Sequence, residues 1–325
     1  MSSTVRKLVG IGIGLTIAIP LVVLMFITPA AKGSPHDLPV GVVGSQQVVE
    51  RVAAALDEQQ PGGFDVTAYP TADDLRRAIE NRDVYGGFVV GPQPQTLIAT
   101  GGSPVVATML TQIGERVAAS SGTTPTTVDI APATDGDPRG MGFGSMLMPV
   151  FLAGVAVGTV SVLVGRRRRI IAAALPIGAA AVAASTIGVA TWVGVLSGNF
   201  VLEWLALALG ILAIAAPIAG LVSVFGPPGI GIAAPVFMLV GMPLAGVSAP
   251  KEYLPWLWGD LGQLLPLGAA GTASRSAAFF DGAGSTAAYV VLVAWAVLGF
   301  ALLLLHGRAP EPEEESVPIT EHVPA

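Results

Sequence analysis

Long apolar runs are the feature that most restricts what this chain can fold into. Six of them have roughly the length that crosses the ~30 Å hydrocarbon core of a bilayer. Charged residues make up only 12% of the chain, against about 25% in soluble domains. The sequence therefore predicts an α-helical polytopic membrane protein with six transmembrane helices. The runs are Leu8–Ile27, Ser145–Val164, Ile170–Leu196, Leu202–Val224, Ile230–Leu244 and Ala287–Leu305.

The first run has two interpretations. Arg6 and Lys7 precede it and the small residues of Thr28–Ala31 follow it, as in a cleaved signal peptide. Its length of roughly 20 residues exceeds the 7–15 of a signal-peptide apolar region and is sufficient for a spanning helix. The length favours an uncleaved first transmembrane helix, within a unit comprising residues 1–31.

The region between the first two runs, residues 32–140, has the pattern of a small α/β domain. Apolar or alternating stretches predict strands, and helical spacing of apolar residues separates them. The order β-α-β-α-β-β-α-β implies a partly parallel sheet covered by helices. The expected strands are Leu38–Val43, Phe64–Tyr69, Val84–Val90, Thr96–Thr100 and Thr127–Ile130, and the expected helices are Gln46–Gln59, Thr71–Arg82 and Pro104–Ala119.

Basic residues outside this domain flank the apolar runs and predict the topology. Six crossings bring the basic sites beside the first, second, third and sixth runs to the same side, which the positive-inside rule makes cytoplasmic. We expect both termini in the cytoplasm of a bacterial-type plasma membrane, residues 32–140 outside it, and a disordered acidic tail at 307–325. These basic residues are Arg6, then Arg166, Arg167, Arg168 and Arg169, and finally Arg308.

Within the helical unit 141–306, the stretch Gly246–Gly282, called here the broken segment, differs from the runs on either side. Prolines and charged residues interrupt it, and Tyr253, Trp256 and Trp258 cluster in its first half. Such aromatic side chains favour the boundary between water and lipid. We expect two short helices, split near Leu265–Pro266, in a re-entrant or interfacial pair spanning residues 248–284 on the outer face.

Candidate structural or gating residues in the broken segment are Pro250, Pro255, Trp256, Pro266, Arg275 and Asp281. Arg275 lies outside, against the positive-inside trend, and has two interpretations. Its charged end reaches water from an interfacial position, or it makes a structural ion pair with Asp260 or Asp281 or contacts an anionic lipid head group. Trp256 and Trp258 are interpreted as interfacial anchors.

Gly154 and Gly158 in the second run form a small-xxx-small face. Glycines at this spacing let the backbones of two helices approach closely. We therefore interpret these two residues as helix-packing positions.

Several kinds of chemistry lack the residues that they need. The sequence contains no P-loop motif, no GxSxG elbow, no pair of histidines at ligand spacing and no cysteine. It also lacks the basic patch of a nucleic-acid-binding domain. Glu203, at the start of the fourth run, is interpreted as an interfacial helix cap, so no mid-membrane carboxylate indicates proton-driven antiport. We expect no enzymatic activity, no cofactor, no metal and no nucleic-acid partner.

The broken segment carries a resemblance to a known group. Its Gly246–Pro250, Leu254–Leu257 and Leu265–Leu267 steps, followed by Arg275, resemble those of the ABC-2 type permease superfamily, within it most nearly the YhgE/Pip (phage infection protein)-like membrane proteins. The stretch LPVGVVGSQQ, which opens the α/β domain, is similar to the strand that follows the first helix in that group.

This resemblance implies export or extraction of an apolar or amphipathic substrate at the cell envelope, by a homodimer or hetero-oligomer in contact with membrane lipids. A separate ATP-binding subunit is the partner of ATPase-coupled members. Here the loop Gly165–Arg169 is shorter than their coupling element and has no acidic residue or Gly-Thr step. The alternative is a non-transporting receptor or assembly protein whose external domain binds an envelope partner.

Overall fold

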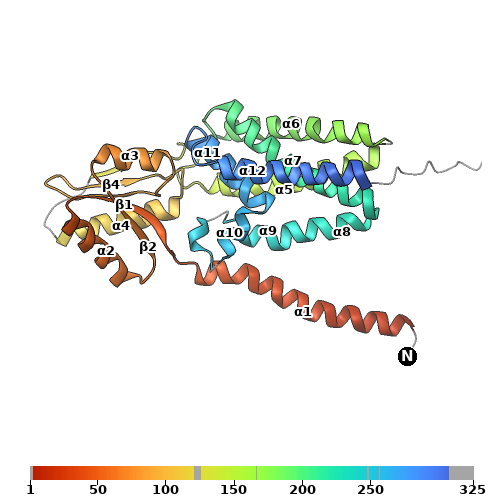
Figure 1. The fold of residues 1–325 in the computed structure, drawn as a ribbon, viewed down its shortest axis with the longest axis horizontal. Coiled ribbons are helices and arrows are strands. Elements are labelled where there is room, and N and C mark those ends of the chain that lie inside the picture. The colour runs from red at the N-terminus through yellow and green to blue at the C-terminus, as the bar shows by residue number, and fades with distance from the viewer. Residues whose placement is uncertain (1–2, 121–125, 166, 247–248, 256, 307–325) are drawn as a thin grey trace, which may run out of the picture.

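The chain forms an α/β domain at one end and a bundle of long apolar helices at the other (Figure 1). This arrangement comes from a computed structural model, which describes residues 3–120, 126–165, 167–246, 249–255 and 257–306. The strands lie between residues 38 and 129, so the domain is inserted between α1 (Ser3–Lys32) and α5 (Met141–Val164).

The α/β domain is built on a five-stranded sheet of order β2-β1-β3-β4-β5. Three of its four strand pairs are parallel, and β3 with β4 is antiparallel, which confirms the predicted partly parallel sheet. The expected succession of strands and helices along the chain is also confirmed, although β3 is shorter than the predicted Val84–Val90. The strands are β1 (Leu38–Val43), β2 (Phe64–Tyr69), β3 (Gly87–Val89), β4 (Gln95–Ile98) and β5 (Thr126–Asp129).

Helices cover both faces of this sheet and bury one apolar cluster on each. On one face, α2 (Gln46–Gln59) and α4 (Pro104–Ser120) pack with Leu38 and Val42 of β1. On the other face, α3 (Ala72–Glu80) buries Leu75 and Ile79. The hydroxyl of Thr71 accepts a hydrogen bond from the backbone N–H of Asp74, 3.1 Å away, and so caps α3 as its sequence predicts.

In the bundle, α7 (Phe200–Phe225) is the central helix, because it packs against α5, α6 (Arg168–Val193), α8 (Pro228–Pro235), α11 (Pro266–Phe279) and α12 (Thr286–Ala301). It is buried along most of its length. Small residues make this packing close. A Cβ placed on Gly158 of α5 would lie 2.6 Å from the carbonyl oxygen of Ala215, and one on Gly299 of α12 would lie 2.2 Å from the carbonyl carbon of Ala216.

Within the described residues, five helices are long and apolar enough to cross a membrane by length and composition, which supports a multi-pass membrane protein. They include α1, α5, α6 and α7, together with the helix from Thr286 to Leu305. The predicted fifth span, Ile230–Leu244, lies in a shorter apolar helix, Pro228–Leu244. That helix consists of α8, a π-helical part η1 (Val236–Val240) and α9 (Gly241–Leu244), and Figure 1 shows it running along the bundle toward the α/β domain.

The broken segment forms η2 (Lys251–Tyr253), α10 (Trp258–Gln263) and α11, at the end of the bundle that faces the α/β domain (Figure 1). The break between α10 and α11 falls at Leu264–Leu265, and Pro266 opens α11. Proline is favoured in the first turn of a helix because its missing N–H has no partner there anyway. The expected pair of short helices, split near Leu265–Pro266, is thus confirmed, with η2 as a third, shorter element.

Candidate functional site at the junction of the domain and the bundle

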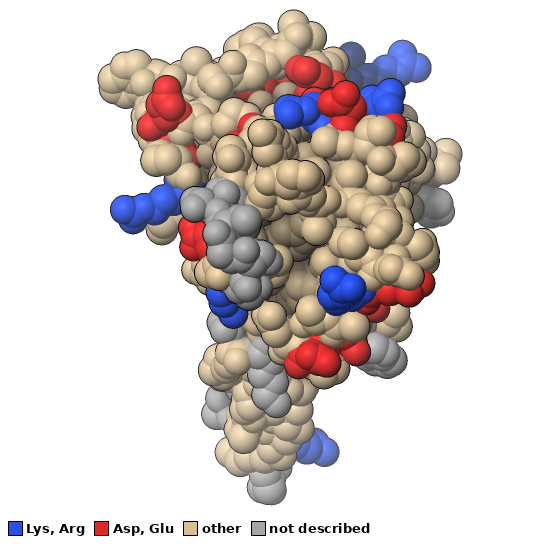
Figure 2. Space-filling view, turned by 90° about the vertical axis from the view of Figure 1, so that its left-hand side faces the viewer, with Lys and Arg blue, Asp and Glu red and all other residues tan. Residues whose placement is uncertain are grey.

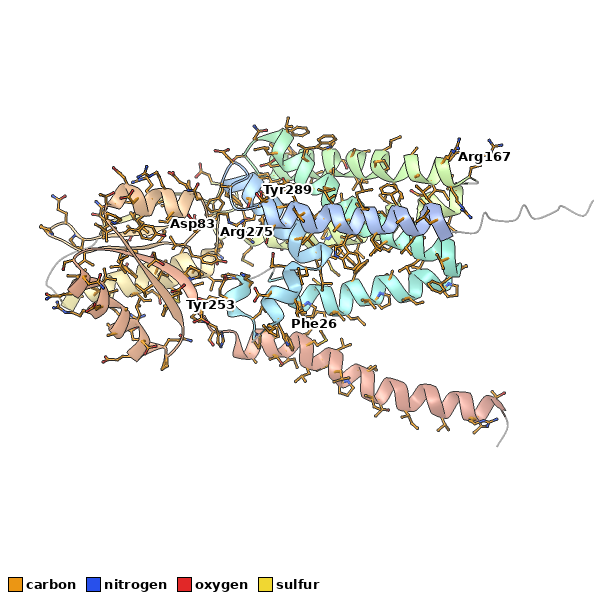
Figure 3. The ribbon with its side chains drawn as sticks, viewed as in Figure 1. Phe26, Asp83, Arg167, Tyr253, Arg275 and Tyr289 are labelled. Atoms are coloured by element: carbon orange, nitrogen blue, oxygen red, sulfur yellow. The ribbon has the colours of Figure 1, made fainter. Side chains whose placement is uncertain are left out.

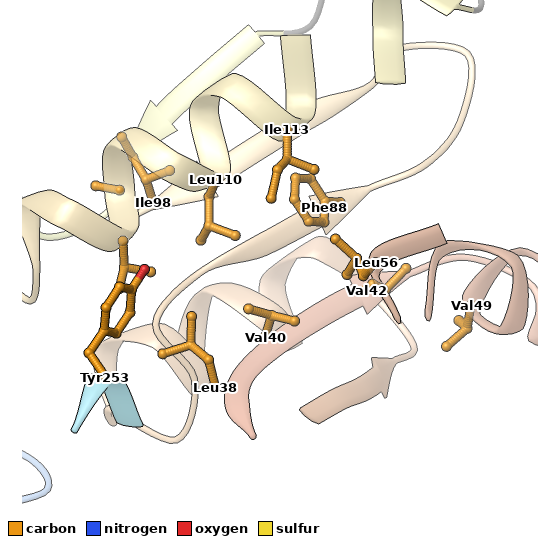
Figure 4. Packing of buried hydrophobic residues seen from close by; sticks show 12 residues of the cluster. Leu38, Val40, Val42, Val49, Leu56, Phe88, Ile98, Leu110, Ile113 and Tyr253 are labelled. Carbon is orange, nitrogen blue, oxygen red and sulfur yellow. The ribbon is translucent and has the colours of Figure 1, made fainter. Parts of the chain in front are cut away.

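The broken segment is tied to the α/β domain by side chains that complete the domain's own cores. Tyr253 of η2 is only 9% exposed and belongs to the cluster of Leu38, Ile98 and Leu110 (Figure 4). Its hydroxyl lies 3.3 Å from the Sδ atom of Met109 in α4. The expectation that Tyr253 lies at the water–lipid boundary is therefore wrong, because the folded domain offers its ring a more complete apolar environment.

Phe280, just after α11, enters the cluster on the other face of the sheet beside Ile79, Leu97 and Ala131. Gly101, after β4, makes room for this end of α11. A Cβ on Gly101 would lie 2.9 Å from the Cβ of Phe279. Tyr253 and Phe280 thus hold the broken segment at two points, one in each core of the domain.

Arg82 reaches from the domain to α11. Its Nη1 atom donates to the hydroxyl of Ser276 and, at 3.3 Å, to the carbonyl oxygen of Thr272. Its guanidinium carbon lies 5.2 Å from the centre of the Phe280 ring, within the range of a cation–π contact. Arg82 has a left-handed backbone, φ 64°, in the position after α3 where glycine is usual. That conformation costs an L-residue roughly 1–2 kcal/mol, so its side-chain contacts offset a local strain.

Arg275 of α11 reaches in the opposite direction, toward the domain. Its Nη1 atom donates to the carbonyl oxygen of Gly101 at 3.2 Å, and its guanidinium carbon lies 4.6 Å from the centre of the Phe143 ring of α5. Among the described residues it makes no ion pair, so the pairing expected with Asp260 or Asp281 is not formed. Asp260 is bound instead by Lys251, whose Nζ lies 2.9 Å from its carboxylate.

A third polar contact joins Tyr85, just before β3, to Glu252 of η2. The hydroxyl of Tyr85 donates to a carboxylate oxygen of Glu252, 2.9 Å away. The backbone carbonyl of Glu252 also accepts from the N–H of His36, just before β1, at 2.9 Å. Glu252 therefore connects the beginning of the domain and its third strand to the broken segment.

These contacts surround a cavity of about 360 Å³ between the α/β domain and the bundle. Charged and polar side chains of the domain and of η2 line one part of it, among them Arg82, Asp83 and Glu252. Apolar side chains from α5, the end of α10 and α12 line another part, namely Leu147, Leu264 and Val291. Figure 3 shows Asp83 and Arg275 close to this junction. The volume of the cavity lies within the range of small-molecule sites, about 300–1,000 Å³.

Burial shifts the pKa values of the two arginines and of Tyr85 in the cavity wall. Burial lowers the pKa of Arg82, an effect that Tyr85 and Glu252 oppose. Burial, and then repulsion from Arg82, lowers the pKa of Arg275 to about 10, so the guanidinium group of Arg275 stays protonated near pH 7. The pKa of Tyr85 is raised, first by burial and then by the negative charge of Glu252, so its phenol stays a donor.

The other predicted residues of the broken segment lie outside the cavity wall or beside it. Pro250 is buried at the start of η2 and lines the cavity, whereas Pro255 lies in the turn before α10. Asp281 is exposed after α11 with φ 49°. Trp256 lies outside the described residues, and Trp258 is half-buried at the start of α10.

None of the predicted topology and packing residues that the structure describes lines the cavity. Arg167 lies at the end of the bundle opposite the α/β domain (Figure 3), where Arg168 donates to the carbonyl oxygen of Leu304, 3.2 Å away. Arg169 is exposed beside them, and Arg166 and Arg308 lie outside the described residues.

Gly154 faces Ile214 and Gly158 faces Ala215, both on α7 of the same chain. The carboxylate of Glu203 accepts from the N–H of Gly198 at 3.1 Å, close to the start of α7.

Sequence reasoning missed Arg82, Tyr85, Glu252 and Phe280. One local signal pointed to Arg82, because an arginine follows Asn81 where a helix commonly ends on glycine. The other three gave no signal, since their partners lie far along the chain.

The face of the domain that points away from the bundle carries both signs of charge. In Figure 2, acidic and basic side chains are interspersed there and separated by uncharged residues. Within the part of the chain that the structure describes, no group of histidine, aspartate and glutamate side chains is arranged to hold a metal ion. The junction cavity is the candidate site because it brings charged and apolar side chains from the domain and the bundle together.

No family model matches the chain, and no curated protein or solved structure matches it.

Proposed function

We propose that this chain is a permease-like protein of the ABC-2/YhgE-Pip type that exports or extracts an amphipathic molecule at the outer face of a bacterial-type plasma membrane. The single observation that carries the proposal is the junction cavity. It combines a charged wall, provided by the α/β domain and η2, with an apolar wall provided by the bundle. An amphipathic molecule requires both kinds of surface at once.

The proposed orientation has six crossings and both termini in the cytoplasm. Two features support it. Arg167 lies at the end of the bundle opposite the domain, and Arg168 and Arg169 follow it at the start of α6, as the positive-inside rule requires of a cytoplasmic end. The apolar helix Pro228–Leu244 has 17 residues, at the lower limit of the roughly 17–25 that span a bilayer.

A disulfide across the junction tests the proposal. The chain contains no cysteine, so the double variant Gly101→Cys/Phe279→Cys introduces the only two thiols. A Cβ on Gly101 lies 2.9 Å from that of Phe279, and separating the two by roughly 0.6–1 Å reaches the disulfide range. The bridge would fix the domain to α11 beside the cavity.

The measured quantity is the transfer of fluorescent NBD-labelled phosphatidylglycerol from cells that express the chain to acceptor vesicles. We expect faster transfer than in control cells, slower transfer after oxidation of the double variant, and recovery on reduction. The two single-cysteine variants should not respond to oxidation. Transfer equal to that of control cells would overturn the proposal.

A specific observation favours the second candidate function, a receptor or assembly protein. Only residues 165–167 separate α5 from α6, so the end opposite the domain offers an ATP-binding subunit little surface to couple to. In that case the domain would bind an envelope partner. Lipid transfer would then equal that of control cells, and no ATP-binding subunit would co-purify with the chain from native membranes.

A further inference from the structure

We propose that Arg82 and Arg275 together bind the anionic head group, phosphate or carboxylate, of an amphiphile whose chain lies along the apolar wall of the junction cavity. This inference rests on the proposed function for its biological role, but the binding itself is argued only from the residues that line the cavity. Both arginines line the cavity, one from the α/β domain and one from α11.

The first argument is a pair of cationic side chains that no carboxylate binds within the described part of the chain. The guanidinium groups of Arg82 and Arg275 are close enough to repel one another. Buried charges are normally paired, because burying them alone costs several kcal/mol. Yet among the described residues neither arginine makes an ion pair. Two carboxylates, Asp83 and Glu252, also line the cavity, but neither forms an ion pair with Arg82 or Arg275. Glu252 accepts a hydrogen bond from Tyr85, and Lys251 is bound to Asp260.

The second argument is unused hydrogen-bonding capacity. A guanidinium group has five N–H donors in a planar fork. The described part of the chain supplies one acceptor to Arg275, the carbonyl oxygen of Gly101, and two to a single nitrogen of Arg82. Both residues line the cavity, so their remaining donors are available to an anion that enters it. Two such forks are suited to phosphate or carboxylate oxygens.

The third argument concerns the rest of the ligand. Leu147, Leu264 and Val291 line the cavity from the bundle side, together with Ala287 and Ala288 of α12. Water in contact with such a wall is displaced favourably by an alkyl chain. A free inorganic anion would use the arginines and leave this wall unused, so the cavity favours an amphiphile over a free anion.

Purified protein in dodecyl maltoside allows a direct test by thermal shift and by isothermal titration. The probes are dodecyl phosphate and inorganic phosphate, each titrated separately. We expect saturable binding of dodecyl phosphate and binding of inorganic phosphate at least about tenfold weaker. Equal affinity for the two probes would overturn the proposal, because the dodecyl chain of the probe would then contribute nothing to binding.

Three variants locate the site. Arg82→Gln and Arg275→Gln should each weaken dodecyl phosphate binding by about tenfold to a hundredfold, the value of one charge-assisted contact. Arg76→Gln, an exposed arginine on α3, is the matched control and should bind as the native chain does. Unchanged binding in both cavity variants would overturn the proposal.

A further variant protects the test against misfolding. Ala287 is exposed at the start of α12 and belongs to the apolar wall. Ala287→Phe narrows the cavity at this wall and leaves both arginines in place. It should weaken dodecyl phosphate binding and leave inorganic phosphate binding unchanged. Arginine-dependent binding without lipid transfer would keep this inference and reject the transport function. Lipid transfer that does not depend on the arginines would keep the transport function and reject this inference.

Discussion

The hydroxyl of Tyr253 lies 3.3 Å from the Sδ atom of Met109, a residue 144 positions earlier in the chain. Through this contact a side chain from the broken segment completes the core of the α/β domain. The domain is consequently not a separate body on a linker, and its stability and the position of the broken segment depend on one another.

Removal of the Tyr253 ring should destabilise the domain itself. Replacing a buried aromatic side chain by alanine costs about 3–5 kcal/mol, because packing is lost and a cavity remains. Tyr253→Ala should therefore be cleaved by a pulse of trypsin at much lower urea concentration than the native chain. Tyr253→Phe keeps the ring and should lose no more than about 1 kcal/mol. Equal urea midpoints for the alanine variant and the native chain would show that the ring contributes nothing.

Arg82→Gly should relax α3 and loosen α11 at the same time. Glycine adopts the left-handed conformation without strain, which recovers roughly 1 kcal/mol at the end of α3. The contacts with Ser276, Thr272 and Phe280 are lost. Hydrogen exchange should accelerate in residues 266–279 and stay unchanged in β1. Arg82→Lys, which keeps the charge and the strain, serves as the comparison, and unaltered exchange in α11 after Arg82→Gly would contradict the prediction.

Glycines of the bundle should respond to alanine according to what faces them. A Cβ at position 158 would lie 2.6 Å from the carbonyl oxygen of Ala215, whereas one at position 188 meets nothing within 4 Å. Gly158→Ala should thus cost about 1–3 kcal/mol through overpacking. Gly188→Ala should be neutral or stabilise by up to about 1 kcal/mol, since alanine favours the helix. Melting temperatures in detergent measure the difference, and similar values for the two variants would reject it.

Alkaline pH should destabilise the chain through Tyr85. Burial and Glu252 raise its pKa above the usual value of about 10. The unfolded chain therefore loses this proton first and binds fewer protons than the folded chain, so stability falls as pH rises above about 10. Tyr85→Phe should flatten this fall, and it should lower the melting temperature at pH 8 by only a few degrees for the lost hydrogen bond. Parallel curves between pH 8 and 11 would exclude this role.

Single cysteines should report the proposed topology, since the chain has no native thiol. Glu58→Cys lies on the exposed side of α2, and Arg169→Cys keeps three of the four clustered arginines. In intact cells a membrane-impermeant maleimide should label Glu58→Cys and should label Arg169→Cys only after permeabilisation. Labelling of both, or the opposite pattern, would refute the proposed orientation.

The order of elements in the α/β domain followed from the sequence because the signals are local. Apolar alternation in Phe64–Tyr69, the cap at Thr71 and the helical spacing in Gln46–Gln59 each act within a few residues. The broken segment was predictable for the same reason, since Pro266 cannot continue α10 and readily begins α11. Membrane-spanning length is likewise a property of one continuous stretch.

The candidate site was decided only by the tertiary structure. Arg82 and Ser276 are 194 positions apart, Gly101 and Arg275 are 174 apart, and Tyr85 and Glu252 are 167 apart. Periodicity specifies which face of an element is apolar, but not which distant element covers it. For this reason the aromatic side chain of Tyr253 suggested a lipid boundary although it fills a protein core. The spacing of Gly154 and Gly158 likewise predicted a helix-packing face but did not identify its partner, which is α7 of the same chain.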